Sequence, residues 1–182
     1  MNNDILIPEE FYCYETGKPF ERCSDCNRDL LRDDVEYSVS KVMRQYEGFD
    51  ARDVLVEFAV CTDCAENLLE EISDESMEVM LAYQLKVMLN WEEDFDMAMS
   101  KCIFSGKPKA QMLSYNKVGF FKGGKLSDEN LPYLIDSAEL DKVNDELSQS
   151  TRDGFDDYYQ NLIGPLPDWV KESMPGGKLV LV

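Results

Sequence analysis

The stretch "ERCSDCNRDL" (residues 21–30) places Cys23 and Cys26 on either side of a turn-forming Ser-Asp pair. The stretch "AVCTDCAENL", which begins at residue 59, repeats this spacing with Cys61 and Cys64. Two Cys-x-x-Cys pairs supply the four sulfur ligands of a tetrahedral zinc site, so no histidine is needed. The chain contains no histidine. We therefore predict one structural Zn²⁺ per chain, bound by these four cysteines.

Paired thiols also allow other chemistry. The opening residues, "MNNDILIPEEFY", lack the basic and apolar regions of a signal peptide, and no apolar run has the length of a membrane span. We therefore expect a cytoplasmic protein with reduced thiols, which disfavours disulfides. A thioredoxin-like redox pair would need a βαβ frame, and rubredoxin-like iron sites tend to carry Gly where Asn27 and Ala65 stand. Buried thiols without metal are the remaining alternative, and we expect Cys13 and Cys102 to be small buried residues.

The residues between the two cysteine pairs predict a β-hairpin. Residues 35–45 and 54–61 are rich in β-branched and aromatic side chains, and "EGFDARD" between them is turn-like. A helical period begins near Ala65. This order of turn, hairpin and helix resembles the treble-clef class of zinc-binding modules over about residues 20–75, and a zinc ribbon with an insertion is the alternative. The resemblance implies an α+β fold in which zinc holds a hairpin and a helix together.

The rest of the chain predicts a helical and hairpin region. Residues 74–100 read as one long helix whose apolar stripe should form the main core against the sheet. That stripe comprises Met77, Leu81, Met88, Trp91 and Phe95. A second hairpin is expected around Gly123-Gly124, followed by helices near 137–150 and 151–163. We expect a zinc module at 1–75 and an α+β remainder at 76–182, packed on the long helix as one compact unit.

One short motif occurs twice. "CYETGKPFE" (13–21) and "CIFSGKPKA" (102–110) share Cys-x-x-Thr/Ser-Gly-Lys-Pro. Gly at this place suits a tight turn of the kind that a metal knuckle requires, and a hydroxyl stands where a knuckle has its second cysteine. The two stretches are either degenerate, metal-free knuckles or an accidental match between turn-forming segments.

Charge is strongly acidic overall and uneven along the chain. The net charge of −19 makes broad binding to nucleic acid unfavourable and favours a partner with a basic surface. Residues 65–100 carry ten acids and one base, whereas residues 101–125 carry six lysines and no acid. These lysines either pair with the acidic helix before them or form a local nucleic-acid site. The lysines are Lys101, Lys107, Lys109, Lys117, Lys122 and Lys125, and the candidate stacking groups are Phe104, Tyr115, Phe120 and Phe121.

No other catalytic signature is present. Without histidine the commonest general base is missing, and the chain has no Gly-rich phosphate loop. Asp153, Asp156 and Asp157 are more typical of a solvated acidic helix face than of a cation site. Our leading hypothesis is a non-enzymatic zinc protein that acts as a protein-interaction, inhibitor or adaptor module. The alternatives are a nucleic-acid-binding regulator and a carboxylate-dependent enzyme.

Overall fold

The fold is a mixed α/β arrangement built on one antiparallel sheet. A computed structural model describes residues 6–49, 51–127 and 130–173. The strands are β1 (Glu36–Gln45), β2 (Arg52–Cys61), β3 (Ser114–Lys122), β4 (Lys125–Leu126) and β5 (Tyr133–Asp136). They follow the order β2-β1-β3-β4, with β5 also paired to β3.

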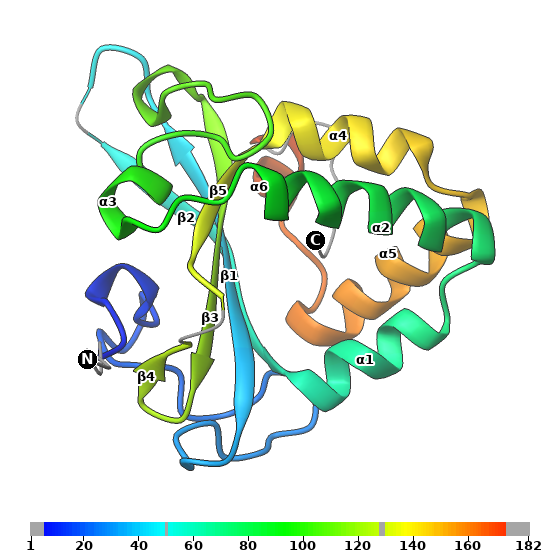
Figure 1. The fold of residues 1–182 in the computed structure, drawn as a ribbon, viewed down its shortest axis with the longest axis horizontal. Coiled ribbons are helices and arrows are strands. Elements are labelled where there is room, and N and C mark those ends of the chain that lie inside the picture. Colours follow the sequence, from blue (N-terminus) through cyan, green and yellow to red (C-terminus); the bar gives the residue numbers. More distant parts are fainter. Residues whose placement is uncertain (1–5, 50, 128–129, 174–182) are drawn as a thin grey trace.

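Most of the helices lie on one side of the sheet, and the amino-terminal segment lies on the other side together with the short helix at 95–98 (Figure 1). The helices are α1 (Thr62–Glu70), α2 (Asp74–Leu89), α3 (Phe95–Ala98), α4 (Ser137–Glu146), α5 (Gln149–Ile163) and α6 (Asp168–Ser173), with the 3₁₀ turns η1 (Glu9–Phe11) and η2 (Lys109–Gln111). Among the described residues, no helix has the length and apolar character needed to cross a membrane.

The two predicted hairpins are confirmed. β1 and β2 form the long hairpin between the cysteine pairs, and β3 and β4 turn at Gly123, whose φ of 55° lies in the left-handed region. The strand β5 is not among the elements predicted from the sequence, because Pro132 interrupts the short apolar run that contains it. Proline is compatible with a position just before a strand, where its missing N–H costs no ladder hydrogen bond.

The helix predicted over 74–100 is shorter than expected. α2 ends at Leu89, where the N–H of Asn90 donates to the carbonyl of Lys86 at 3.1 Å. Asp94 then caps the separate short helix α3 by accepting from the N–H of Met97 at 2.9 Å. The acidic stretch after α2 therefore starts a new element.

The predicted core stripe on this helix is wrong. Leu81 is 51% exposed and Met88 is 61% exposed, while Met77, Trp91 and Phe95 are only partly buried. The buried side of α2 instead carries Ser76 and Tyr83. Because α2 is apolar around most of its surface, the sequence period did not identify which side packs against the protein.

The face of the sheet opposite the helices is closed by the amino-terminal segment. The ring of Phe11 is fully buried and packs edge-to-face on Phe121 at 5.3 Å. It also covers Gly119, where the absence of a side chain lets the ring approach the β3 backbone. Both faces of the sheet are thus covered over its central strands.

The two halves of the sheet repeat one arrangement. Tyr37 of β1 pairs with Cys61 at the end of β2, and Tyr115 of β3 pairs with Asp136 at the end of β5. The next three residue pairs of the β1–β2 ladder correspond in order to the next three pairs of the β3–β5 ladder. In each half the outer strand leads directly into a helix, β2 into α1 and β5 into α4, and a second helix follows.

An approximate two-fold axis relates these halves. It passes through the centre of the β1–β3 ladder, where Ser40 faces Val118. Ser40 and Val118 hold corresponding positions in the two halves, so a two-fold axis that exchanges β1 and β3 must pass between them. We call residues 22–89 the first half and residues 101–163 the second half.

Candidate metal centre

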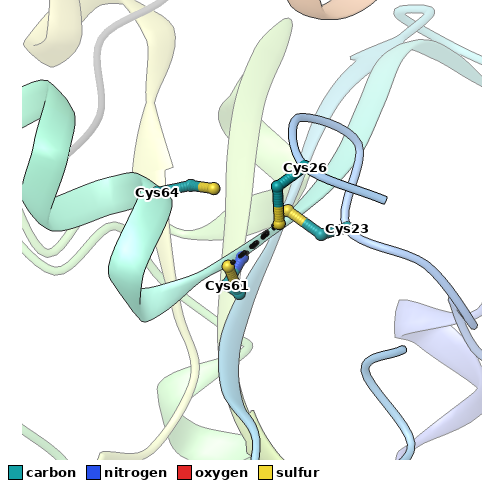
Figure 2. Close-up of side chains that lie close together, drawn as sticks. All are labelled: Cys23, Cys26, Cys61 and Cys64. Carbon is teal, nitrogen blue, oxygen red and sulfur yellow. Dashed lines mark hydrogen bonds between the residues drawn. The ribbon is translucent and has the colours of Figure 1, made fainter. Parts of the chain in front are cut away.

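The four sequence-predicted cysteines meet at one edge of the sheet. Their Sγ atoms all lie within 4.8 Å of one another, and the Sγ atoms of Cys26 and Cys61 are 3.7 Å apart. Cys23 and Cys26 come from the loop before β1, Cys61 ends β2, and Cys64 lies in the first turn of α1 (Figure 2). All but Cys26 are buried.

The loop that carries the first pair is a tight turn. The N–H of Cys23 donates to the carbonyl of Arg28 at 2.9 Å, and the N–H of Asn27 donates to the carbonyl of Cys23 at 3.0 Å. Asn27 has a φ of 61°, which among non-glycine residues asparagine tolerates best. Asn27 therefore takes the left-handed conformation without a glycine at the position where rubredoxin-like sites tend to carry one.

This turn is attached to the end of β2 by three hydrogen bonds. The N–H of Ser24 donates to the carbonyl of Ala59 at 2.8 Å, and the N–H of Ala59 donates to Oγ of Ser24 at 3.1 Å. The N–H of Cys61 donates to Sγ of Cys23 at 3.4 Å. The turn and the strand end are thus held in register, which brings the two cysteine pairs together.

Local electrostatics act on these sulfurs in opposite directions. Cys61 caps α1, so the thiols lie at the positive end of the helix dipole. Burial raises the pKa of the Cys61 and Cys64 thiols. Burial also acts to raise the pKa of Cys26, but hydrogen bonds from the backbone of Arg28 and from the other thiols outweigh it, so the pKa is lowered. A bound cation would stabilise all four thiolates, and metal binding would then release protons.

The repeated motif corresponds to a repeated turn. In residues 102–107 the N–H of Cys102 donates to the carbonyl of Lys107 at 2.9 Å, and the N–H of Gly106 donates to the carbonyl of Cys102 at 2.8 Å. Residues 13–18 contain the same two bonds, both at 2.8 Å. The left-handed residue is Gly106 in one turn and Gly17 in the other.

A hydroxyl replaces the second cysteine in both of these turns. Oγ1 of Thr16 accepts from the N–H of Lys18 at 3.3 Å, and Oγ of Ser105 accepts from the N–H of Lys107 at 3.4 Å. These turns therefore have the knuckle geometry without the second thiol. Cys102 is buried as predicted, whereas Cys13 is only partly buried.

Lysines of 101–125 pair with acids from several parts of the chain. Four pairs are Lys101–Glu92 at 2.6 Å, Lys107–Asp136 at 2.7 Å, Lys117–Glu10 at 3.9 Å and Lys122–Glu36 at 2.8 Å. The expected pairing with the acidic stretch 65–100 is therefore met by Lys101, whose partner is Glu92, and the acids paired with Lys107, Lys117 and Lys122 lie outside that stretch. Tyr115 and Phe121 are buried in the core, so two of the four candidate stacking groups are not at the surface.

The aspartates of α5 do not gather into a site. Asp153 and Asp157 are exposed on the helix, and Asp156 is partly buried. Nε2 of Gln149 donates to Oδ1 of Asp153 at 2.7 Å. Within residues 6–49, 51–127 and 130–173, the four cysteines are the one group of metal-ligating side chains that converges.

One feature was missed from sequence. A groove of about 650 Å³ lies between α1, α2 and the helix-covered face of the sheet. Its lining includes Leu69, Met77, Met80, Leu81, Met88 and Phe120. The available signal was the apolar character of α2 on more than one face, since a helix in an ordinary packed position shows a single apolar stripe. We call this feature the α2 groove.

Comparison of the chain with known protein families, with curated proteins and with solved structures finds no match.

Proposed function

We propose that the protein is a non-enzymatic, zinc-stapled module that binds another protein. The metal assignment is carried by the convergence of four sulfurs from two separate turns, all within 4.8 Å. Zinc–sulfur bonds of about 2.3 Å place the sulfurs of a tetrahedron about 3.8 Å apart. The Cys26–Cys61 separation of 3.7 Å matches this edge. The turn, hairpin and helix that carry the thiols support the resemblance to a treble clef.

The ion would be structural. Four thiolates fill a tetrahedral shell, whereas a catalytic zinc keeps a position open for water or substrate. The ion would join the loop before β1 to the junction between β2 and α1, in addition to the three hydrogen bonds that already connect these segments. Elemental analysis of protein purified without added metal should find about one Zn²⁺ per chain. Iron in its place, or no metal in the folded protein, would contradict this assignment.

The protein-binding assignment is carried by the α2 groove. The two-fold relation between the halves of the chain explains why the α2 groove is open. Phe155 and Tyr159 of α5 fill the space that the two-fold axis relates to the groove, where Tyr159 packs on Phe58 of β2 at 5.7 Å. Met80 and Gln84 of α2 follow its cap Ser73 at the same distances in sequence as Phe155 and Tyr159 follow the α5 cap Ser148. Aromatic rings in one half are thus replaced by a flexible thioether and an exposed amide in the other.

The groove suits an apolar anchor on a basic segment. Methionine side chains adapt to varied apolar partners. Exposed acids lie within a few residues of the lining residues on the two helices, Glu66 and Glu70 on α1 and Asp74 and Glu78 on α2. The one base of 65–100, Lys86, lies over the ring of Tyr83 at 4.0 Å. We therefore assign the groove to a partner segment that is amphipathic and rich in Lys or Arg, bound by the helix-in-groove mode.

A second copy of the chain is a poorer occupant. Each copy carries a net charge of −19, and the acids flanking the groove would face those of the other copy. Like charges opposed at an interface cost binding free energy and slow association. A basic segment would instead gain from the same charges.

A labelled synthetic peptide tests the groove directly. The probe has leucines at three- and four-residue steps and lysines elsewhere, and a matched peptide has glutamate for lysine. We expect the lysine peptide to bind the full chain and the glutamate peptide not to bind. The double variant Leu81→Ser/Met88→Ser should weaken binding at least about tenfold. Both side chains are more than half exposed, so the fold should persist.

The matched control is Leu113→Ser. Leu113 is 64% exposed and does not line the groove, so its replacement should leave peptide binding unchanged. Glu66→Gln/Glu78→Gln should weaken binding several-fold at low salt and less at high salt, because salt screens exposed charges. Equal binding of the two peptides, or equal losses in the groove and control variants, would refute the assignment.

Two other occupants would also refute it. If the groove joins two copies of the chain, sedimentation should show a dimer that Leu81→Ser/Met88→Ser abolishes. If the chain's own residues 174–182 fill it, the lysine peptide should bind only after those residues are removed. Neither result would affect the metal assignment, which the elemental analysis decides separately.

A further inference from the structure

The second half of the chain contains a counterpart of the metal centre. We propose that the four ligand positions are repeated there and that the ammonium of Lys107 supplies the cation in place of a metal. The inference rests on the proposed metal at the first site. Position for position, Cys23, Cys26, Cys61 and Cys64 correspond to Cys102, Ser105, Asp136 and Glu139.

The sulfur contact is the same in both halves. In the first half, the N–H of Cys61 donates to Sγ of Cys23 at 3.4 Å. In the second half, the N–H of Asp136 donates to Sγ of Cys102 at 3.3 Å. The backbone of Asp136 thus contacts the turn of 102–107 in the same way that the backbone of Cys61 contacts the turn of 23–28.

The backbone attachment of the turn is also repeated. The N–H of Ser24 donates to the carbonyl of Ala59, and the N–H of Ile103 donates to the carbonyl of Leu134, both at 2.8 Å. In each half the accepting residue lies two positions before the helix cap. The turn of 102–107 is therefore docked on β5 as the turn of 23–28 is docked on β2.

The helix positions agree as well. Cys61 is the cap residue of α1, and Cys64 lies three residues later in its first turn. Asp136 is the cap residue of α4, and Glu139 lies three residues later in its first turn. The same spacing therefore places the second residue of each pair in the first turn of the helix that the first residue caps.

The residues at the four corresponding positions differ in type between the halves, and the difference suits an ammonium in place of a metal ion. Oxygen ligands replace three of the four thiols, and the side chain of Asp136 is only 9% exposed. A buried carboxylate needs a compensating charge. Nζ of Lys107 lies 2.7 Å from Oδ2 of Asp136, so the ammonium joins the turn to the start of α4. This is the connection that a metal ion would make between the turn of 23–28 and the start of α1.

A graft tests whether the positions are equivalent. The variant Ser105→Cys/Lys107→Ser/Asp136→Cys/Glu139→Cys completes a set of four thiols with Cys102. We expect it to retain about two Zn²⁺ per chain after passage over a chelating resin, against about one for the wild type. The matched control adds Cys102→Ser to the graft and should return the content to about one.

A second measurement does not require the four-substitution graft to fold. Lys107→Met leaves the Asp136 carboxylate without its ammonium and should lower the melting temperature by about 5 °C. Lys142→Met is the matched control. It removes an ion pair of similar length, 2.6 Å to Glu139, from a lysine side chain that is 63% exposed, and should change melting by no more than about 1–2 °C.

The outcomes separate this inference from the proposed function. A folded graft that holds no more zinc than the wild type, or equal effects of the two lysine variants, would overturn the equivalence. A wild-type protein without metal would overturn the proposed zinc site instead. The lysine variants would then still decide whether Lys107 joins the second turn to α4.

Discussion

Ser73 and Ser148 each cap the helix that follows them, and their Oγ atoms lie 2.8 Å apart. The bonds around them are reciprocal. The N–H of Ser73 donates to Oγ1 of Thr151 at 3.1 Å, and the N–H of Ser148 donates to Oγ of Ser76 at 2.9 Å. The first turns of α2 and α5 thus satisfy each other's backbone donors, in keeping with the two-fold relation between the halves.

Ser148→Ala should lower the free energy of unfolding by about 1–2 kcal/mol. It removes the cap that accepts from the N–H of Thr151 and leaves the hydroxyl of Ser73 without that partner. Denaturant unfolding would measure the loss. Ser150→Ala, at a neighbouring exposed position, should cost less than half as much, and equal losses would show that the shared cap is unimportant.

Cys61→Ser should lower the free energy of unfolding by more than about 3 kcal/mol, because metal binding contributes to folding free energy. A strong chelator should lower the melting temperature of the wild type and have little effect on this variant. Cys13→Ser lies outside the cluster and should keep both the metal and the chelator response. A variant that melts like the wild type would show that the site is dispensable.

Gly119→Ala should cost about 1–3 kcal/mol of stability. A Cβ at this position would lie 2.7 Å from Cε1 of Phe11 and 2.9 Å from Cζ of Phe121, so the buried rings would have to move. Thermal and denaturant unfolding would measure the cost. A neutral effect would mean that the amino-terminal segment is not packed on β3 as described.

Gly154→Ala should have the opposite sign and stabilise the protein by about 0.5–1 kcal/mol. Gly154 lies inside α5, where alanine has the higher helix propensity. Nothing lies within 4 Å of the added Cβ. Loss of stability in the same unfolding assay would contradict the placement of this residue in an open part of the helix.

Lys117 should make stability depend on alkaline pH. Burial lowers its pKa to about 8, with Glu10 opposing and Lys109, Lys41 and Arg52 reinforcing the shift. Above that pH the folded protein releases a proton that the unfolded chain keeps up to its ordinary pKa of 10.5. Since the unfolded state then binds more protons, the free energy of unfolding should rise with pH in this interval.

Comparison with Lys117→Met isolates this contribution. Between about pH 7 and about pH 9.5 the wild type should gain roughly 2 kcal/mol relative to the variant. The variant should be the more stable protein at neutral pH, because it buries no charge there. Parallel pH profiles for the two proteins would show that Lys117 is not buried as a charged group.

The local parts of this protein follow from its sequence. Two Cys-x-x-Cys pairs predict one converging group of thiols because each pair fixes two sulfurs within a single turn. The β1–β2 and β3–β4 hairpins follow from β-branched runs and from Gly123. The cap at Asp136 is equally local, because its carboxylate accepts from the nearby N–H of Ala138 at 3.2 Å.

The tertiary structure decided the features that depend on contacts between segments distant in the sequence. The side of α2 that packs could not be read from its sequence, because Leu81 and Tyr83 are both apolar enough for a core, and only the neighbouring helices select between them. The pairing of Lys107 with Asp136 likewise depends on β5 lying beside the turn of 102–107. Sequence by itself determined the hairpin turns and the two thiol pairs, since each of these arises within a few residues. The two-fold repeat and the open groove could be recognised only in the packed chain. The two halves share hydrogen bonds and packing, but few of their corresponding side chains are the same.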